Sequence, residues 1–152
     1  MSRRTSNLDR TRWTGDLLEL APDARTLEVG HGPGIGLEAS LAAVPRGSVA
    51  GLDHSRTMHA MAAKRNRAAL GAGRLQLPVD DAEHLPPGLG RFDAIYSCNV
   101  WLFWTDPVAT MAALSDLLVP GGRMAITHLP RHGNATANGH QGCRRPDQGP
   151  DG

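Results

Sequence analysis

Short apolar runs and amphipathic stretches alternate along most of the chain. The apolar runs predict five strands, at 26–30, 48–53, 74–79, 92–99 and 123–127. The stretches before and between them predict four helices, at 13–20, 36–44, 55–70 and 107–119. Strands that alternate with helices are typical of a parallel sheet with right-handed crossover connections and helices on both faces. The pattern therefore predicts an α/β fold.

The alternation stops near Arg131. The remaining residues, RHGNATANGHQGCRRPDQGPDG, contain no Leu, Ile, Val, Met or aromatic side chain. Such a segment buries too little apolar surface to offset the entropy lost on ordering. We therefore expect one folded domain over 1–130 and a disordered tail over 131–152.

Charge and composition narrow the range of partners. The chain has 152 residues, with 16 Lys and Arg against 15 Asp and Glu, so its formal net charge is +1. That balance produces no overall field that would attract nucleic acid or an anionic membrane. No apolar run approaches the roughly 20 residues that span a bilayer, and two cysteines make no disulfide framework. We expect a cytoplasmic protein without a nucleic-acid or membrane partner and without a metal site.

The most informative segment is LEVGHGPGIG, where the first predicted strand meets the next helix. Its glycines, Gly30, Gly32, Gly34 and Gly36, occupy alternate positions. Glycine permits positive φ angles and removes the Cβ that would hold a ligand away from the backbone. The helix that follows offers unpaired N–H groups at its N-terminus. The loop therefore favours a nucleotide-like ligand at the carboxyl ends of the strands.

The residues in and around the glycine loop narrow the choice of nucleotide. No Lys follows the glycines, so the loop is not a phosphate-binding P-loop, and a G-x-G-x-x-A pattern fits only late, at 34–39. Glu28 beside the loop suits a cationic or hydroxyl-bearing ligand better than a pyrophosphate. Asp53, 23 positions after Gly30, matches the spacing of a carboxylate that binds the ribose of either a nicotinamide or an adenosyl cofactor. An acidic side chain of the DDAEHLP segment could accept a hydrogen bond from an adenine amino group.

Five segments, taken together, resemble the class I S-adenosylmethionine-dependent methyltransferases, in particular the small type-11-like group. They lie in order within residues 13–128 and read LEVGHGPGIG, GLDHS, DDAEHLP, FDAIYSCNVWLFW and LSDLLVPGGRMAIT. The resemblance implies a three-layer α/β/α Rossmann-like fold with about five parallel strands in the order 3-2-1-4-5. Family members continue with a helix and an antiparallel pair of strands, which we do not find here. We therefore expect the fifth strand to form an edge, and our hypothesis is a truncated or frame-altered product.

The same resemblance implies S-adenosylmethionine as cofactor and gives a role to each matching position. Acidic and glycine residues of the first loop would line the methionyl part, Asp53 would hold the ribose, and Cys98 and Asn99 would face the sulfonium. The cofactor-binding residues implied in this way are Glu28, Gly30, His31, Gly32, Gly34, Asp53, His54, Asp81, Ala82 and Asn99. Trp101, Phe103 and Trp104 either line the acceptor pocket or cover the end of the sheet.

The implied reaction is in-line transfer of a methyl group, in which positioning supplies most of the rate enhancement. A general base is required only where the acceptor must lose a proton. His31, His54 and Asp106 could act as bases by position, and we expect none of them to do so. Two alternatives remain open at this point: an NAD(P)-dependent oxidoreductase of Rossmann type, and a non-catalytic fragment that binds the cofactor. The acceptor and the oligomeric state are open as well.

Overall fold

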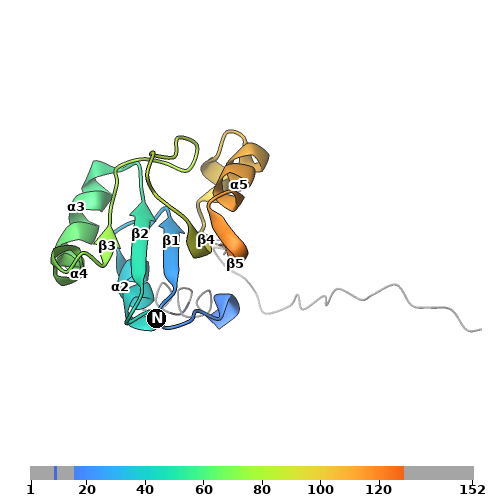
Figure 1. Cartoon of the computed structure of the whole chain (residues 1–152). Coiled ribbons are helices and arrows are strands. Elements are labelled where there is room, and N and C mark those ends of the chain that lie inside the picture. Colours follow the sequence, from blue (N-terminus) through green and yellow to red (C-terminus); the bar gives the residue numbers. More distant parts are fainter. Residues whose placement is uncertain (1–8, 10–15, 129–152) are drawn as a thin grey trace, which may run out of the picture.

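A five-stranded parallel sheet forms the centre of the molecule (Figure 1). The computed structural model describes residue 9 and residues 16–128. The strands run in the order β3-β2-β1-β4-β5, and all neighbours pair in parallel, which confirms the predicted 3-2-1-4-5 sheet. Their bounds are β1 (Arg25–Val29), β2 (Ser48–Leu52), β3 (Leu75–Gln76), β4 (Phe92–Cys98) and β5 (Leu118–Thr127).

Helices cover both faces of this sheet. They are α2 (Ile35–Ala43), α3 (Arg56–Arg65), α4 (Arg67–Gly71), the 3-10 helix η1 (Trp101–Phe103) and α5 (Pro107–Ser115). On one face, Leu37 of α2 and Ala62 of α3 pack with Val49 of β2. On the other face, Leu114 of α5 packs with Leu27 of β1. Side chains alternate between the two faces along each strand, so β2 contributes Val49 to the first cluster and Ala50 and Leu52 to the second.

Local chemistry accounts for where the helices begin. The side chain of Ser55 accepts a hydrogen bond from the N–H of Met58 at 3.2 Å, and Asp106 Oδ1 accepts one from the N–H of Ala109 at 3.0 Å. Pro107 follows Asp106 in the first turn of α5, where a missing N–H costs nothing. These contacts confirm the helix starts that the sequence predicts at both positions.

Three predicted elements differ from the observed ones. The helix expected at 55–70 is divided at Asn66 into α3 and α4, because the side chain of Asn66 donates to the carbonyl groups of Gly34 and Ala62. The strand expected at 74–79 pairs over only two residues, on the sheet edge that Pro78 predicts. The helix expected to reach residue 119 ends at Ser115.

The segment Pro120-Gly121-Gly122, expected as a turn, belongs to β5. The register of β5 against β4 moves from Leu118 opposite Phe92 to Arg123 opposite Ala94. Five steps along β5 therefore match two along β4, and the extra residues form a bulge in which Gly121 has a φ of 79°. A bulge keeps the strand continuous where the sequence pattern alone indicates an interruption.

Two predicted segments extend beyond the residues that the structure describes. Of the leading helix predicted at 13–20, residues 16–18 are helical, and Leu18 packs with Ala94 and Tyr96 of β4. The tail predicted at 131–152 lies outside the described residues. No helix among the described residues has the length and apolar character needed to cross a membrane.

Candidate cofactor and active site

The glycine loop between β1 and α2 takes a backbone shape that favours glycine. Gly30, Gly32 and Gly34 have φ angles of 74°, 55° and 90°, which lie in the left-handed region. A Cβ on Gly30 would overlap the side chain of Val100, and a Cβ on Gly34 would lie 2.8 Å from Ala62 Cα. A Cβ on Gly32 would meet no atom within 4 Å. Gly30 and Gly34 therefore permit close packing, whereas Gly32 leaves an open approach to the backbone.

Asp53 connects the glycine loop to the loop between β2 and α3. Its carboxylate accepts hydrogen bonds from two backbone N–H groups, with Oδ2 2.9 Å from Gly32 N and Oδ1 2.9 Å from Ser55 N. The side chain lies at the carboxyl end of β2 and is 9% exposed. The carboxylate is thus fixed in orientation by both loops, and each of its oxygens retains capacity to accept from a ligand.

A cavity of about 460 Å³ opens beside Asp53, at the carboxyl ends of β1 and β2. Its size lies in the usual range for small-molecule sites. The residues that line it come from four segments far apart in the sequence: Val29, Gly30, Leu52, Asp53, His54, Asp81, Ala82, Glu83, Val100, Phe103 and Trp104. Seven predicted site residues are therefore gathered here: Gly30, Asp53, His54, Asp81, Ala82, Phe103 and Trp104.

The loop after β3 forms one wall of the cavity. Asp81 Oδ1 accepts from the backbone N–H groups of Glu83 and His84 at 2.9 Å, and it lies 3.0 Å from His84 Nδ1. Partial burial raises the pKa of Asp81, but these contacts with His84 and Glu83 outweigh it and hold the pKa below its ordinary value. Asp81 therefore presents an ionised carboxylate to the cavity at neutral pH.

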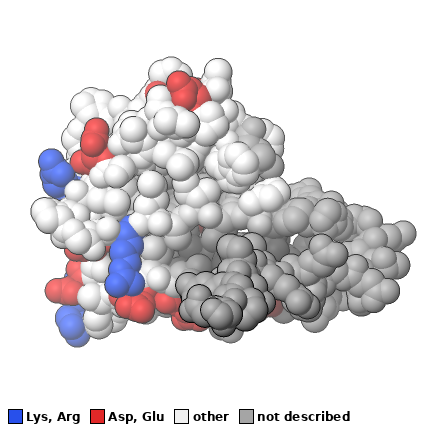
Figure 2. All heavy atoms as spheres, turned by 90° about the vertical axis from the view of Figure 1, so that its right-hand side faces the viewer, with Lys and Arg blue, Asp and Glu red and all other residues white. Residues whose placement is uncertain are grey.

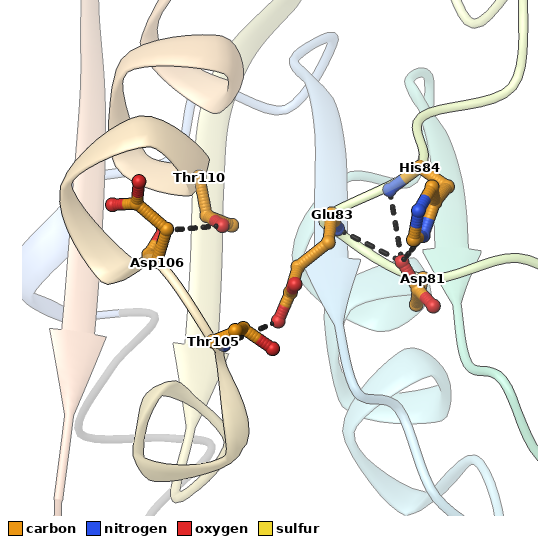
Figure 3. Close-up of polar contacts among 6 residues, drawn as sticks. All are labelled: Asp81, Glu83, His84, Thr105, Asp106 and Thr110. Carbon is orange, nitrogen blue, oxygen red and sulfur yellow. Dashed lines mark hydrogen bonds and ion pairs between the residues drawn. The ribbon is translucent and has the colours of Figure 1, made fainter.

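Glu83 connects this loop to the segment that follows η1. Its Oε1 accepts a hydrogen bond from the backbone N–H of Thr105 at 2.6 Å (Figure 3). Phe103 and Trp104, which directly precede Thr105, both line the cavity. The sequence allows Glu83 to be a solvated loop residue. Its place in the DDAEHLP segment suggests that Glu83 lies near the site. The sequence does not reveal the hydrogen bond to Thr105, because the two residues are 22 positions apart.

Glu28 is buried beneath the glycine loop and does not line the cavity. The hydroxyl of Tyr96 donates to Glu28 Oε2 at 3.0 Å and also contacts Ser40 Oγ. Burial raises the pKa of Glu28 from 4.5 to about 8, the hydrogen bond from Tyr96 opposes that rise, and the negative charge of Asp53 adds to it. Glu28 is therefore mostly protonated at neutral pH and acts here as a hydrogen-bonded core group.

His31 is 4% exposed and also lies outside the cavity lining. Its Nδ1 is 2.7 Å from the carbonyl oxygen of Gly32, which places the ring proton on Nδ1 because a carbonyl can only accept. The other nitrogen, Nε2, is buried without a hydrogen-bond partner among the described residues. Burial lowers the pKa of His31, so the ring is neutral near pH 7.

The remaining predicted residues lie near the cavity without lining it. Gly32 and Gly34 belong to the adjoining loop, and Asn99 has a φ of 62° and donates its N–H to the carbonyl of Thr127 at 2.9 Å. Trp101 packs edge to face with His128, with ring centroids 6.2 Å apart. The other four lining residues, to which the sequence assigns no individual role, are Val29, Leu52, Glu83 and Val100. A smaller cavity of about 290 Å³, at the opposite ends of the strands, contains none of the predicted residues.

Comparison with known proteins identifies the family to which this fold and site belong. Residues 26–122 match a family model described as "Methyltransferase domain". The methyltransferase YdaC of Bacillus subtilis (strain 168) is 28% identical over 130 residues, which cover 86% of this chain and 70% of YdaC. A trans-aconitate 2-methyltransferase of Streptomyces avermitilis is 34% identical over 123 residues, which cover 77% of this chain and 45% of that enzyme.

Solved structures show the same fold at low sequence identity. The [4+2]-cyclase SpnF superposes with a TM-score of 0.73 at 23% identity, over 83% of this chain and 46% of SpnF. Coclaurine N-methyltransferase, bound to N-methylheliamine and SAH, gives a TM-score of 0.71 at 12% identity, over 82% of this chain and 35% of the enzyme. The chain thus spans less than half the length of both. A cyclase and a methyltransferase share this fold, so the chemistry has to be argued from the site.

Proposed function

The chain belongs to the methyltransferase domain family, and we propose that it binds S-adenosylmethionine and transfers the methyl group to a small-molecule acceptor. The observation that carries this proposal is the carboxylate of Asp53, fixed at the cavity by the N–H groups of Gly32 and Ser55. A carboxylate held at the end of the second strand is placed to accept both hydroxyls of an adenosine ribose.

The chemistry of the lining favours this cofactor over a nicotinamide dinucleotide. Asp53, Asp81 and Glu83 line the cavity, and its described lining contains no Lys or Arg. Carboxylates repel a pyrophosphate and tolerate a phosphate-free adenosyl sulfonium, which carries positive charge. The open backbone at Gly32 gives the methionyl part a surface to lie against.

We assign the individual roles as follows. Asp53 holds the ribose hydroxyls, His54 lies beside the adenine, and Asp81 and Ala82 contact the adenine edge, since all four line the cavity. Asn99 lies at the end of β4, beside the proposed reacting side of the cofactor. Glu28, His31 and Gly34 serve the same site from beneath, because they shape the glycine loop rather than the cavity wall.

Bound S-adenosylmethionine supplies an activated methyl group that an acceptor displaces in line with the sulfur. The residues of this chain orient the two partners and exclude water, which is where most of the rate enhancement of such a transfer arises. We propose no general base, since His31 is buried outside the cavity lining, Asp106 caps α5, and His54 is assigned to the adenine. Trp104 and Phe103 line the acceptor side, and we place Trp101 in packing against His128.

The wider setting of the protein is part of the same proposal. We take residues 1–130 as the cofactor-binding domain, the cytoplasm as its location, and small molecules rather than nucleic acid as its substrates. The balance of 16 basic and 15 acidic residues supports the last point.

Turnover is the direct test of catalysis. We expect the chain to release S-adenosylhomocysteine from S-adenosylmethionine when an acceptor panel of amines, alcohols, thiols and carboxylic acids is added, measured by mass spectrometry. Release without any acceptor is the background to subtract. Tight binding of S-adenosylhomocysteine with no release across the panel would contradict the enzyme assignment and support the alternative, a non-catalytic fragment that binds the cofactor.

A further inference from the structure

The outer rim of the cavity combines an exposed aromatic ring with a carboxylate. Phe103 is 82% exposed although its side chain is large and apolar, while its neighbour Trp104 is buried in the cavity wall. A ligand that enters the cavity can cover this exposed ring, and covering the ring removes apolar surface from water. Glu83 is exposed on the same rim, tied to Thr105 immediately after these rings. We call Glu83, Phe103 and Trp104 the acceptor rim.

The charges around the acceptor rim are negative. The titratable side chains that line the cavity are Asp53, His54, Asp81 and Glu83, and none of the described lining residues is Lys or Arg. His84, the nearest histidine on the same loop, is paired with Asp81. Viewed from the β5 side, the topmost charged side chains of the described surface are acidic (Figure 2). An anionic acceptor would find no positive side chain among these residues.

Glu83 has an oxygen available for a ligand. Its Oε1 accepts from Thr105 N, and its Oε2 makes no hydrogen bond within the described residues. Asp53 and Asp81, in contrast, are the carboxylates assigned to the cofactor, which leaves Glu83 for the second substrate. A carboxylate and aromatic rings that line the same cavity can both attract a cation, the carboxylate through its charge and the rings through their quadrupoles.

We propose that the methyl acceptor carries a protonated amine, which binds between the carboxylate of Glu83 and the rings of Phe103 and Trp104. This inference rests on the proposed function, because it takes the remainder of the cavity as the cofactor site. It concerns recognition of the acceptor and applies whichever atom receives the methyl group. The same rim would reject carboxylates and phosphates of similar size, because Glu83 repels them.

Two probes with one skeleton separate charge from shape. Phenethylamine is a cation at neutral pH, and 3-phenylpropionate has the same phenylethyl group with a negative charge. In calorimetric titrations of the chain saturated with S-adenosylhomocysteine, we expect phenethylamine to bind at least about tenfold more tightly than 3-phenylpropionate. We expect Glu83→Gln to weaken phenethylamine binding by about tenfold, since the amide still accepts from Thr105 N but carries no charge.

The matched control is Glu38→Gln on α2, which removes an exposed carboxylate paired with Arg65 of α3 and should leave both affinities unchanged. Equal binding of the two probes, an unchanged amine affinity in Glu83→Gln, or displacement of S-adenosylhomocysteine by phenethylamine would each overturn the inference. Failure of S-adenosylhomocysteine to bind would instead refute the proposed function. The amine titration without S-adenosylhomocysteine would then still decide whether the rim selects a cation.

Discussion

Asp53→Ala is expected to weaken binding of S-adenosylhomocysteine by about a hundredfold. The change removes a carboxylate that we assign to both ribose hydroxyls, and two charge-assisted hydrogen bonds together correspond to about 3 kcal/mol. It also leaves the N–H groups of Gly32 and Ser55 without their acceptor, so the loop loses part of its preorganisation. Isothermal titration calorimetry of the two proteins measures the difference directly.

Asp53→Asn accompanies the alanine variant, because its side-chain oxygen still accepts one of the two backbone hydrogen bonds. We expect an intermediate loss of affinity with a melting temperature close to that of the wild type. The exposed control Glu38→Gln should bind S-adenosylhomocysteine as the wild type does. An affinity in Asp53→Ala within threefold of wild type, with a cooperative melt, would remove Asp53 from the cofactor site.

The second large effect concerns stability and pH at Glu28. Because burial raises its pKa from 4.5 to about 8, the folded chain keeps a proton that the unfolded chain releases throughout this window. The contribution of this proton to the free energy of unfolding is therefore fully present below about pH 4.5 and is lost as the pH rises through about 8. The loss amounts to about 5 kcal/mol for the full shift. The Glu28→Gln variant has no such proton, so its free energy of unfolding should fall less over the same range.

Urea unfolding of wild type and Glu28→Gln at a series of pH values between about 5 and 9 tests this account. We expect the difference between the two proteins to grow with pH in favour of the glutamine variant, by a few kcal/mol at the alkaline end. His31, whose pKa burial lowers, destabilises both proteins alike as the pH falls and cancels in the difference. Parallel curves would mean that Glu28 is ionised in the folded chain at neutral pH.

The sequence predicted the parts of the site that depend on local chemistry. Alternating glycines require a special backbone wherever they occur, and the structure places three of them at positive φ. Ser55 and Asp106 cap helices through contacts three residues away, which a sequence pattern can reveal. Asp53 follows from its spacing to the first loop, because the ends of neighbouring parallel strands meet at one edge of the sheet.

Long-range packing accounts for what the sequence did not predict. Tyr96 reaches Glu28 across 68 positions, so the burial that changes the protonation of Glu28 appears only in the assembled sheet. The three neighbouring aromatic residues after β4 look alike in sequence, yet Trp101 turns toward His128 while Phe103 and Trp104 reach the cavity. All three residues lie within or directly after the short helix η1, and no residue pattern in the sequence separates them.

The central claim is that this cavity takes a phosphate-free adenosyl sulfonium. Titrating one preparation of the wild-type chain in turn with S-adenosylmethionine and with NADH, under one set of conditions, tests it most directly. We predict a saturable binding heat at one site per chain for S-adenosylmethionine and none for NADH. Saturable binding of NADH without binding of S-adenosylmethionine would contradict the claim.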